Sequence, residues 1–193
     1  MALSVINALL DEKEWIERKA HRDRVKKYVR DFLKYKDRNS LVDLFSELWS
    51  TEAFKNKEWW VDNRILKNQD IKDVAKVIQN LINESIPLDE RLNTMIKGLG
   101  KTAFTEILYC FYPNKYPIMS KRSLSSLRKL GYLKSIDKNI ITGETYRKFI
   151  KACKSFLDDL SDLKKEIEEK VGFDLPNFDF TDRILDGLYK GEI

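Results

Sequence analysis

Apolar residues recur every three or four positions along most of this chain, and that spacing constrains its fold more than any other feature. Side chains three or four residues apart share one face of an α-helix, whereas a half-buried strand alternates apolar with polar residues. No segment of the sequence alternates convincingly. The spacing therefore predicts an all-α fold, a bundle of roughly eight to ten helices.

The same pattern predicts where helices begin and end. Short polar residues precede several apolar runs, and their side-chain oxygens can accept hydrogen bonds from unpaired backbone N–H groups. The expected N-caps are Asn39 or Ser40, Asp70 and Ser120. Gly131 is expected to follow the end of its helix, and Pro87 to close another. The expected helices span 3–10, 13–35, 41–49, 71–81, 88–96, 121–130 and 145–171, and a further helix begins directly after Gly100 and runs to Phe111. After a loop over 173–180 a last helix starts at Thr181.

The 193 residues are expected to fold as a single helical domain, because the chain has no internal repeat and no Gly/Ser-rich linker. The stretch 83–89 around Pro87 could divide this domain into two lobes, 1–86 and 87–193. No run approaches the roughly 20 apolar residues of a membrane span. The first residues lack the basic region of a secretory signal, so a cytoplasmic location is expected.

The scarcity of histidine and cysteine excludes several kinds of chemistry. A structural zinc site needs about four such ligands, whereas His21, Cys110 and Cys153 are scattered along the sequence. His21 would have to be the base of any Ser-His-Asp or Cys-His enzyme. It lies among Lys, Arg and Asp residues, which indicates a solvated helix face. We therefore expect no metal site, no cofactor and no catalytic histidine.

Charge is distributed unevenly along the chain. The whole sequence has 36 Lys and Arg against 31 Asp and Glu, a net charge of +5. Residues 97–134 contain eight Lys and Arg but a single acid, Glu106, so this window carries +7. Residues 153–193 contain six bases against eleven acids, a net −5. A basic window of this kind is typical of a phosphate-binding surface.

Within the basic window, two glycines bracket one leucine between two apolar helices. Gly98 and Gly100 can adopt positive φ and let another backbone approach closely, and Leu99 is expected to point into the core. The amides that follow lie at a helix N-terminus, where they can donate to an anion such as a DNA phosphate. The predicted DNA-binding residues are Lys97, Gly98, Leu99, Gly100, Lys101, Thr102, Lys115, Lys121, Arg122 and Arg128.

Aromatic residues provide a second means of contacting nucleic acid, by stacking on bases. Adjacent residues of a helix point in different directions, so Trp59 and Trp60 cannot both face one core. We expect one of the two to be exposed, either for base stacking or for an interdomain contact. Tyr116 is a further stacking candidate, with packing as the alternative. Trp15 and Trp49 fall on apolar stripes and are expected in the core.

Three segments follow one another between Leu92 and Tyr132: the glycine hairpin, Tyr116-Pro117-Ile118 and Leu130-Gly131. The hairpin resembles the helix-hairpin-helix motif, and the order of the segments is similar to that in the helix-hairpin-helix DNA glycosylases. In those enzymes a catalytic aspartate follows the Pro-apolar pair, and a catalytic lysine often follows the hairpin. Here Met119 stands at the aspartate position, and Lys101 or Thr102 lies near the lysine position.

The absence of a carboxylate at position 119 favours a binding function over a catalytic one. Without this carboxylate, no obvious group can stabilise an oxocarbenium-like transition state or activate water. The sequence therefore predicts a non-catalytic DNA-binding module. One alternative is a diverged glycosylase or lyase that acts on damaged or modified bases with Lys101 or an unrecognised carboxylate. Another is a helical protein-interaction scaffold in which the acidic residues 158–169 dock a partner.

A longer series of segments extends this pattern, namely Gly98-Leu99-Gly100, Thr105-Glu106-Ile107-Leu108, Pro113-Asn114-Lys115-Tyr116-Pro117-Ile118, Arg122-Ser123 and Leu130-Gly131-Tyr132. The series resembles the N-terminal DNA-recognition region of McrB-like, modification-dependent restriction proteins and related AAA-type ATPases. That resemblance implies a specificity module for double-stranded DNA in a restriction or defence system. It also implies two partners, a nuclease subunit and an AAA-type GTPase or ATPase motor on the same or another chain. The chain has no phosphate-binding loop, because the glycine spacing around the hairpin is wrong for one.

Overall fold

The computed structural model describes residues 9–134 and 141–191. Over these ranges the chain is all-helical and has no strand, which confirms the predicted fold class. The helices are α2 (Glu12–Tyr35), α3 (Arg38–Glu47), α4 (Lys57–Trp60), α5 (Ile71–Leu81), α6 (Leu88–Asn93), α7 (Lys101–Phe111), α8 (Lys121–Lys129), α9 (Gly143–Asp159), α10 (Ser161–Val171) and α11 (Asn177–Lys190). Three shorter segments are η1 (Trp49–Thr51), the π-helical η2 (Val61–Ile65) and η3 (Leu66–Asn68).

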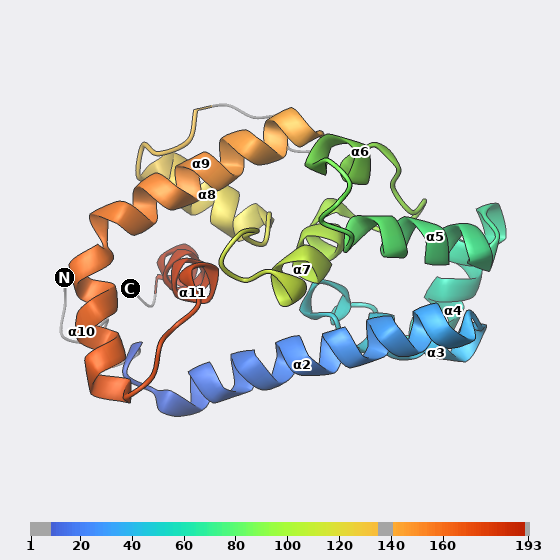
Figure 1. Cartoon of the computed structure of the whole chain (residues 1–193), viewed down its shortest axis with the longest axis horizontal. Helices are drawn as coiled ribbons and strands as arrows, with labels where there is room; N and C mark the ends of the chain where they lie inside the picture. Colours follow the sequence, from blue (N-terminus) through green and yellow to red (C-terminus); the bar gives the residue numbers. More distant parts are fainter. Residues whose placement is uncertain (1–8, 135–140, 192–193) are drawn as a thin grey trace.

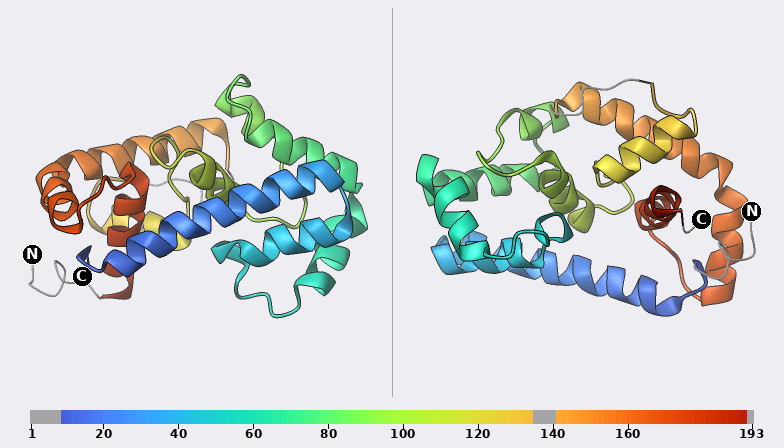
Figure 2. Two further views of the ribbon diagram at one scale, coloured as in Figure 1. Left: turned by 60° about the horizontal axis from the view of Figure 1, so that its bottom comes forward. Right: turned by 180° about the vertical axis from the view of Figure 1, so that it is seen from behind.

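The longest helix, α2, runs along the molecule, with α3, α4 and α5 at one end and α10 and α11 at the other (Figure 1). The two further views show the same arrangement (Figure 2). α2 packs against α3, α5 and α7, whereas α8 packs against α9 and α11. The division into lobes 1–86 and 87–193 stays a prediction. α2 contacts α5, which precedes residue 87, and also α7, which follows it.

The central helix, α7, is enclosed on nearly all sides. Residues 103–110 are all buried, and Phe104, Ile107 and Tyr109 have no exposed surface. A helix enclosed in this way needs apolar side chains around most of its circumference, which this segment provides. The hairpin between α6 and α7 is consequently attached to the most buried element of the fold.

Three predicted helix ends are confirmed. The Asp70 side chain caps α5. Ser120 caps α8 and forms a reciprocal capping box with Ser123. After α8, Gly131 has a φ of +82° and the Tyr132 N–H donates back to the last turn, as in a Schellman motif. These ends fix the length of α8, the helix beside the hairpin.

Other predicted boundaries are wrong. α3 is capped by Asp37, whose carboxylate accepts from the Ser40 N–H at 2.8 Å, and neither Asn39 nor Ser40 is the cap. The predicted helix 145–171 consists of two helices, α9 and α10, because the backbone leaves helical geometry at Leu160 (φ −109°, ψ 12°). Apolar residues keep the helical spacing on both sides of Leu160, because α9 and α10 each bury one face.

Two prolines lie at the N-termini of helices, Pro87 where a helix from residue 88 was predicted and Pro176 where a loop was predicted. α5 ends at Leu81, well before Pro87, and Pro87 is instead the N-cap of α6. Pro176 is the N-cap of α11, which therefore starts at Asn177 and not at Thr181. The fixed φ of proline suits the entry to a helix. The predicted helix over 3–10 lies almost wholly outside the described residues.

Candidate nucleic-acid interface

The hairpin is built around Gly98, which adopts a φ of +85°. A Cβ atom at this position would lie 2.2 Å from the backbone oxygen of Arg64 in η2, so both the backbone conformation and the close approach require glycine. Gly100 has a φ of −76° and open surroundings, because it serves as the N-cap of α7 in an extended conformation. The structure therefore confirms the close approach at Gly98 only.

Gln69 holds the hairpin from the neighbouring segment. Its side-chain amide donates to the Lys97 carbonyl at 3.0 Å and accepts from the Lys97 N–H at 3.2 Å. Leu99 is buried, as predicted, and its N–H donates to the Ile96 carbonyl at 3.1 Å. The loop is thus preorganised, which lowers the cost of binding a ligand. Sequence reasoning missed Gln69 because 28 residues separate it from Lys97.

The N-terminus of α7 is suited to an anion. α7 begins at Lys101, and no described side chain caps it. The first turn of an α-helix leaves N–H groups without intrahelical acceptors, and the helix dipole adds partial positive charge at this end. Both effects favour a phosphate group.

A hollow of about 460 Å³, termed the basic groove, lies beside this N-terminus. Its lining residues are Lys101, Thr102, Lys121, Leu124, Ser125, Arg128 and Lys129. Four of these side chains are cationic, and the lining contains no carboxylate among the residues described. The α8 members are spaced so that they share one helix face. The start of α7 and one face of α8 therefore converge on the same hollow.

The basic groove brings together four of the predicted DNA-binding residues, Lys101, Thr102, Lys121 and Arg128. The other hairpin residues, 97–100, directly precede Lys101 and Thr102 in the chain. Sequence reasoning missed Lys129. Its spacing of eight positions from Lys121, which places both on one face of α8, was the signal that could have found it.

Two other predicted contacts are bound to carboxylates. Arg122 Nη1 donates to Asp186 Oδ1 at 2.6 Å, and Lys115 Nζ donates to Glu84 Oε1 at 2.9 Å. Lys115 lies beyond the C-terminus of α7, whose 11 residues span about 16 Å at 1.5 Å per residue. The structure therefore does not bring Lys115 to the basic groove.

The aromatic candidates lie elsewhere. Trp60 is 5% exposed and stacks on Phe54, whereas Trp59 is 52% exposed. This confirms that one of the two adjacent tryptophans is exposed. The Tyr116 hydroxyl accepts a hydrogen bond from Arg91, and its ring packs among other tyrosines. None of the three candidates, Trp59, Trp60 and Tyr116, lines the basic groove.

A second hollow of about 540 Å³ adjoins the basic groove and shares Thr102 and Lys121 with it. It is termed the acidic pocket, because its described lining has six carboxylates and three cationic side chains. The lining residues are Glu14, Glu17, Arg18, Trp49, Ser50, Glu52, Thr102, Glu106, Ile118, Ser120, Lys121, Arg122, Asp182 and Asp186. Side chains from α2, α7, α8 and α11 meet here.

His21 lies behind the acidic pocket and not on the solvated face that the sequence predicted. It is fully buried, its ring stacks on Trp49 with centroids 3.7 Å apart, and its Nε2 lies 3.1 Å from Glu106 Oε1. The neighbouring charges misled the prediction because Arg18 and Arg22 are also buried and pair with carboxylates of α11. The inner face of α2 is therefore partly charged.

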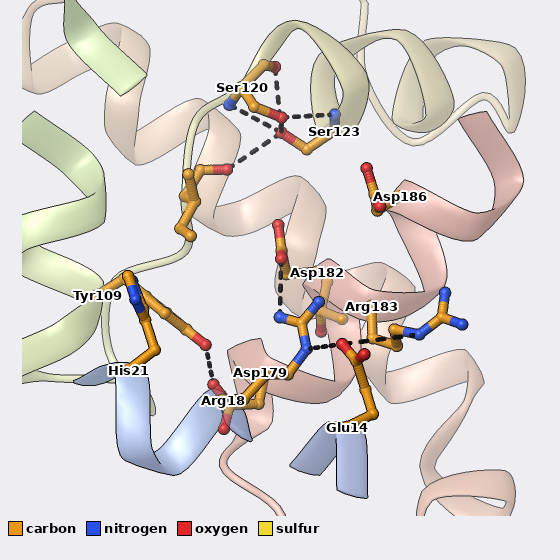
Figure 3. Close-up of polar contacts among 12 residues, drawn as sticks. Glu14, Arg18, His21, Tyr109, Ser120, Ser123, Asp179, Asp182, Arg183 and Asp186 are labelled. Carbon is orange, nitrogen blue, oxygen red and sulfur yellow. Dashed lines mark hydrogen bonds and ion pairs between the residues drawn. The ribbon is translucent and has the colours of Figure 1, made fainter. Parts of the chain in front are cut away.

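Two carboxylates of the acidic pocket, Glu106 and Asp182, already have partners. Glu106 accepts from the backbone N–H groups of Trp49 at 2.7 Å and Ser50 at 2.9 Å. Asp182 accepts from Arg18 at 3.0 Å (Figure 3). Burial raises the pKa of Asp182, and the charge of Arg18 offsets this only in part. These bonds join η1 to α7 and α2 to α11, so both carboxylates serve the fold.

The position that holds aspartate in the glycosylases is part of the core. Met119 is fully buried. Its N–H donates to Thr105 Oγ1 at 2.9 Å, and its carbonyl accepts from Thr102 Oγ1 at 3.4 Å. These two bonds attach the segment before α8 to α7 and so hold the two sides of the basic groove together.

Comparisons of the chain with protein-family models, with curated proteins and with solved structures gave no match. In the part of the chain that the structure describes, no three His, Cys, Asp or Glu side chains are grouped so as to hold a metal ion. Of the described helices, none combines the length and apolar character that crossing a membrane requires. The property that stands out is a surface suited to an extended anion.

Proposed function

We propose that this chain is a DNA-binding module that contacts the phosphate backbone of double-stranded DNA through the helix-hairpin-helix and α8. The observation that carries the proposal is the basic groove, where four cationic side chains surround an uncapped helix N-terminus and the described lining has no carboxylate. Neutralising phosphates releases condensed counterions, which supplies most of the non-specific affinity for DNA.

The geometry favours contact with the backbone over the reading of bases. A side chain that reads bases must reach into a groove of the duplex. The hairpin is instead a tight loop held by Gln69 and packed against Arg64. Backbone contacts position a protein on the duplex but carry no sequence information directly. The hairpin and α8 would thus supply affinity, and specificity would come from further contacts.

Removal of two charges from the basic groove tests the proposal. Lys101→Gln with Lys121→Gln should weaken binding to a labelled duplex by about tenfold or more at low salt, measured by fluorescence anisotropy. The slope of log affinity against log salt should fall by roughly two. Equal affinities of this variant and the wild type would overturn the proposal.

The matched control is Lys151→Gln with Lys154→Gln. Both lysines are exposed on α9 and lie outside the basic groove. This variant loses the same net charge, so it should keep most of the affinity. An equal loss in both variants would mean that total charge, and not the groove, determines binding.

We further propose that the module serves a restriction or defence system, as the resemblance to McrB-like proteins implies. The support is the order of the hairpin, the Tyr-Pro-Ile segment and the Leu-Gly-Tyr segment. The implied partners are an AAA-type motor and a nuclease subunit. Anisotropy titrations with methylated and unmethylated duplexes test the modification dependence: a clear preference supports it, and equal affinities argue against it.

A diverged DNA glycosylase or lyase is a second candidate function, and the acidic pocket is the observation that favours it. The pocket adjoins the basic groove and is large enough to receive a nucleotide. The buried Met119 and the bonded carboxylates of Glu106 and Asp182 count against it. Incubation with abasic and modified-base duplexes, with borohydride present, tests it. A released base or a trapped lysine adduct would support an enzyme, and the absence of both would exclude it.

A further inference from the structure

Arg122 follows Lys121 at the start of α8, but only Lys121 lines the basic groove. Arg122 lines the acidic pocket, where its Nη1 donates to Asp186 Oδ1 at 2.6 Å. The other oxygen of Asp186 pairs with Lys190 at 2.7 Å. A carboxylate of α11 thus neutralises a cation in the first turn of α8.

Asp186 is the fixed member of this pair. Its side chain is 18% exposed, whereas that of Arg122 is 53% exposed, so the guanidinium is the group with room to move. α11 is fastened to α8 by a hydrogen bond from Ser126 Oγ to the Leu185 carbonyl at 2.8 Å. Burial opposes ionisation of Asp186, but hydrogen bonds from Lys190 and Arg122 outweigh burial and lower its pKa. The carboxylate is therefore charged at neutral pH.

We propose that Asp186 tethers Arg122 away from the basic groove and thereby limits the affinity of the module for the DNA backbone. The proposal rests on the proposed DNA-binding function and concerns the regulation of that same site. The Asp186 carboxylate and a DNA phosphate are alternative anionic partners for one guanidinium. While it is paired with Asp186, Arg122 lines the acidic pocket and its charge is neutralised there, so it adds little to the affinity of the wild type.

The ion pair of Lys115 with Glu84 offers a matched control. It also joins an exposed cation to a carboxylate, at 2.9 Å. Lys115 lies beyond the C-terminus of α7, whereas the hairpin precedes the N-terminus. Glu84→Gln therefore changes the net charge by the same amount as Asp186→Asn, but it releases a cation far from the basic groove.

The experiment is a double-mutant cycle at Arg122 and Asp186, read as duplex affinity over a range of salt concentrations. Asp186→Asn should bind about three- to tenfold more tightly at low salt, with a salt slope steeper by about one, because one more phosphate is neutralised. Arg122→Gln alone should change the affinity less than about twofold, since its charge is already paired. The double variant should lose the whole gain, and Glu84→Gln should stay within about twofold of the wild type.

Three results from the carboxylate variants would overturn the tether: an Asp186→Asn variant that binds like the wild type, a gain that survives in the double variant, or an equal gain in Glu84→Gln. Arg122→Gln keeps the test decisive even where Asp186→Asn fails to fold. A tenfold loss of affinity in that single variant would show that Arg122 already contacts phosphate. A wild type without salt-sensitive affinity for DNA would instead refute the proposed function, and the tether with it.

Discussion

The basic groove and the acidic pocket meet at Thr102 and Lys121, yet they use charge in opposite ways. In the groove, four cations surround one hollow whose described lining has no carboxylate. In the pocket, the buried Glu106 and the half-buried Asp182 are bonded to groups from other elements. Cations gathered on a surface attract an external anion, whereas enclosed ion pairs join helices. The number of charges in a segment therefore says less than their placement.

This contrast separates two kinds of substitution. Changes at Glu106 and Asp182 in the acidic pocket should alter the free energy of unfolding, because these two carboxylates join η1 to α7 and α2 to α11. Changes in the basic groove should alter affinity for DNA and leave stability nearly unchanged. The comparison fails if a substitution at Glu106 or Asp182 changes only the affinity for DNA, or if a substitution in the basic groove changes stability.

The largest effect is expected for Glu106→Ala. The substitution would leave the N–H groups of Trp49 and Ser50 without their acceptor, and His21 Nε2 would lose its carboxylate partner. Leaving enclosed N–H donors without an acceptor costs about 1–3 kcal/mol each, so the free energy of unfolding should fall by about 3–5 kcal/mol, which urea denaturation measures. Glu166→Ala is the control, because its half-exposed ion pair is worth about 0.5 kcal/mol or less. Equal losses in the two variants would contradict the structural role of the pocket.

A smaller loss of stability is expected for Gly98→Ala. Gly98 lies in the hairpin that leads into the basic groove. The new Cβ atom would clash with the Arg64 carbonyl, and alanine would have to keep the positive φ of Gly98. The free energy of unfolding should therefore fall by about 2–4 kcal/mol. Gly100→Ala has open surroundings and should cost about 1 kcal/mol or less. Thermal or urea denaturation of both variants measures the difference. Similar stabilities would show that the hairpin does not pack closely on η2.

Asp182 and Asp186, one turn apart on α11, should titrate on opposite sides of the ordinary pKa of 3.8. Burial raises the pKa of Asp182 despite Arg18, and burial of Asp186 is outweighed by Lys190 and Arg122, which lower its pKa. The contribution of Asp182 to stability is therefore full below 3.8 and is lost as the pH rises through its folded pKa. That of Asp186 is present above 3.8 and is lost as the pH falls through its folded pKa. NMR titration of the carboxyl carbons measures both, and shifts in one direction would contradict this assignment.

The smallest effect is expected for Lys115→Gln. Lys115 belongs to the same basic window as Lys121, but it lies outside the basic groove and pairs with Glu84. Its loss should change duplex affinity less than about twofold, whereas Lys121→Gln should weaken binding about fivefold at low salt. Anisotropy titrations of the two variants sharpen the comparison. If both variants lose the same affinity, the charge of the whole window matters and the groove does not.

Local signals predicted much of the fold. Asp70, Ser120 and Gly131 act on backbone groups within a few residues, so the sequence alone identifies them. The burial of Leu99 follows from its place between two apolar helices. The basic groove was partly predictable, because the spacing within α8 indicates which of its cations share a face.

Contacts between distant segments could not be predicted in this way. His21 and Glu106 are 85 residues apart, and Arg122 and Asp186 are 64 apart. Charged residues around His21 predict that it is exposed. On α2, however, Arg18 and Arg22 pair with carboxylates of the distant α11, and this face of the helix is buried. Ile16 shows the converse, since it is an apolar residue of α2 and yet is 59% exposed.

The most direct test of the central claim is to locate the DNA on the surface by NMR. Addition of a short duplex to the isotope-labelled chain should shift the backbone amide signals of residues 97–102 and of α8. The amide of Trp59 on α4, which lies outside the basic groove, should not shift. Shifts confined to α4 or other helices, with the hairpin and α8 unchanged, would contradict the account.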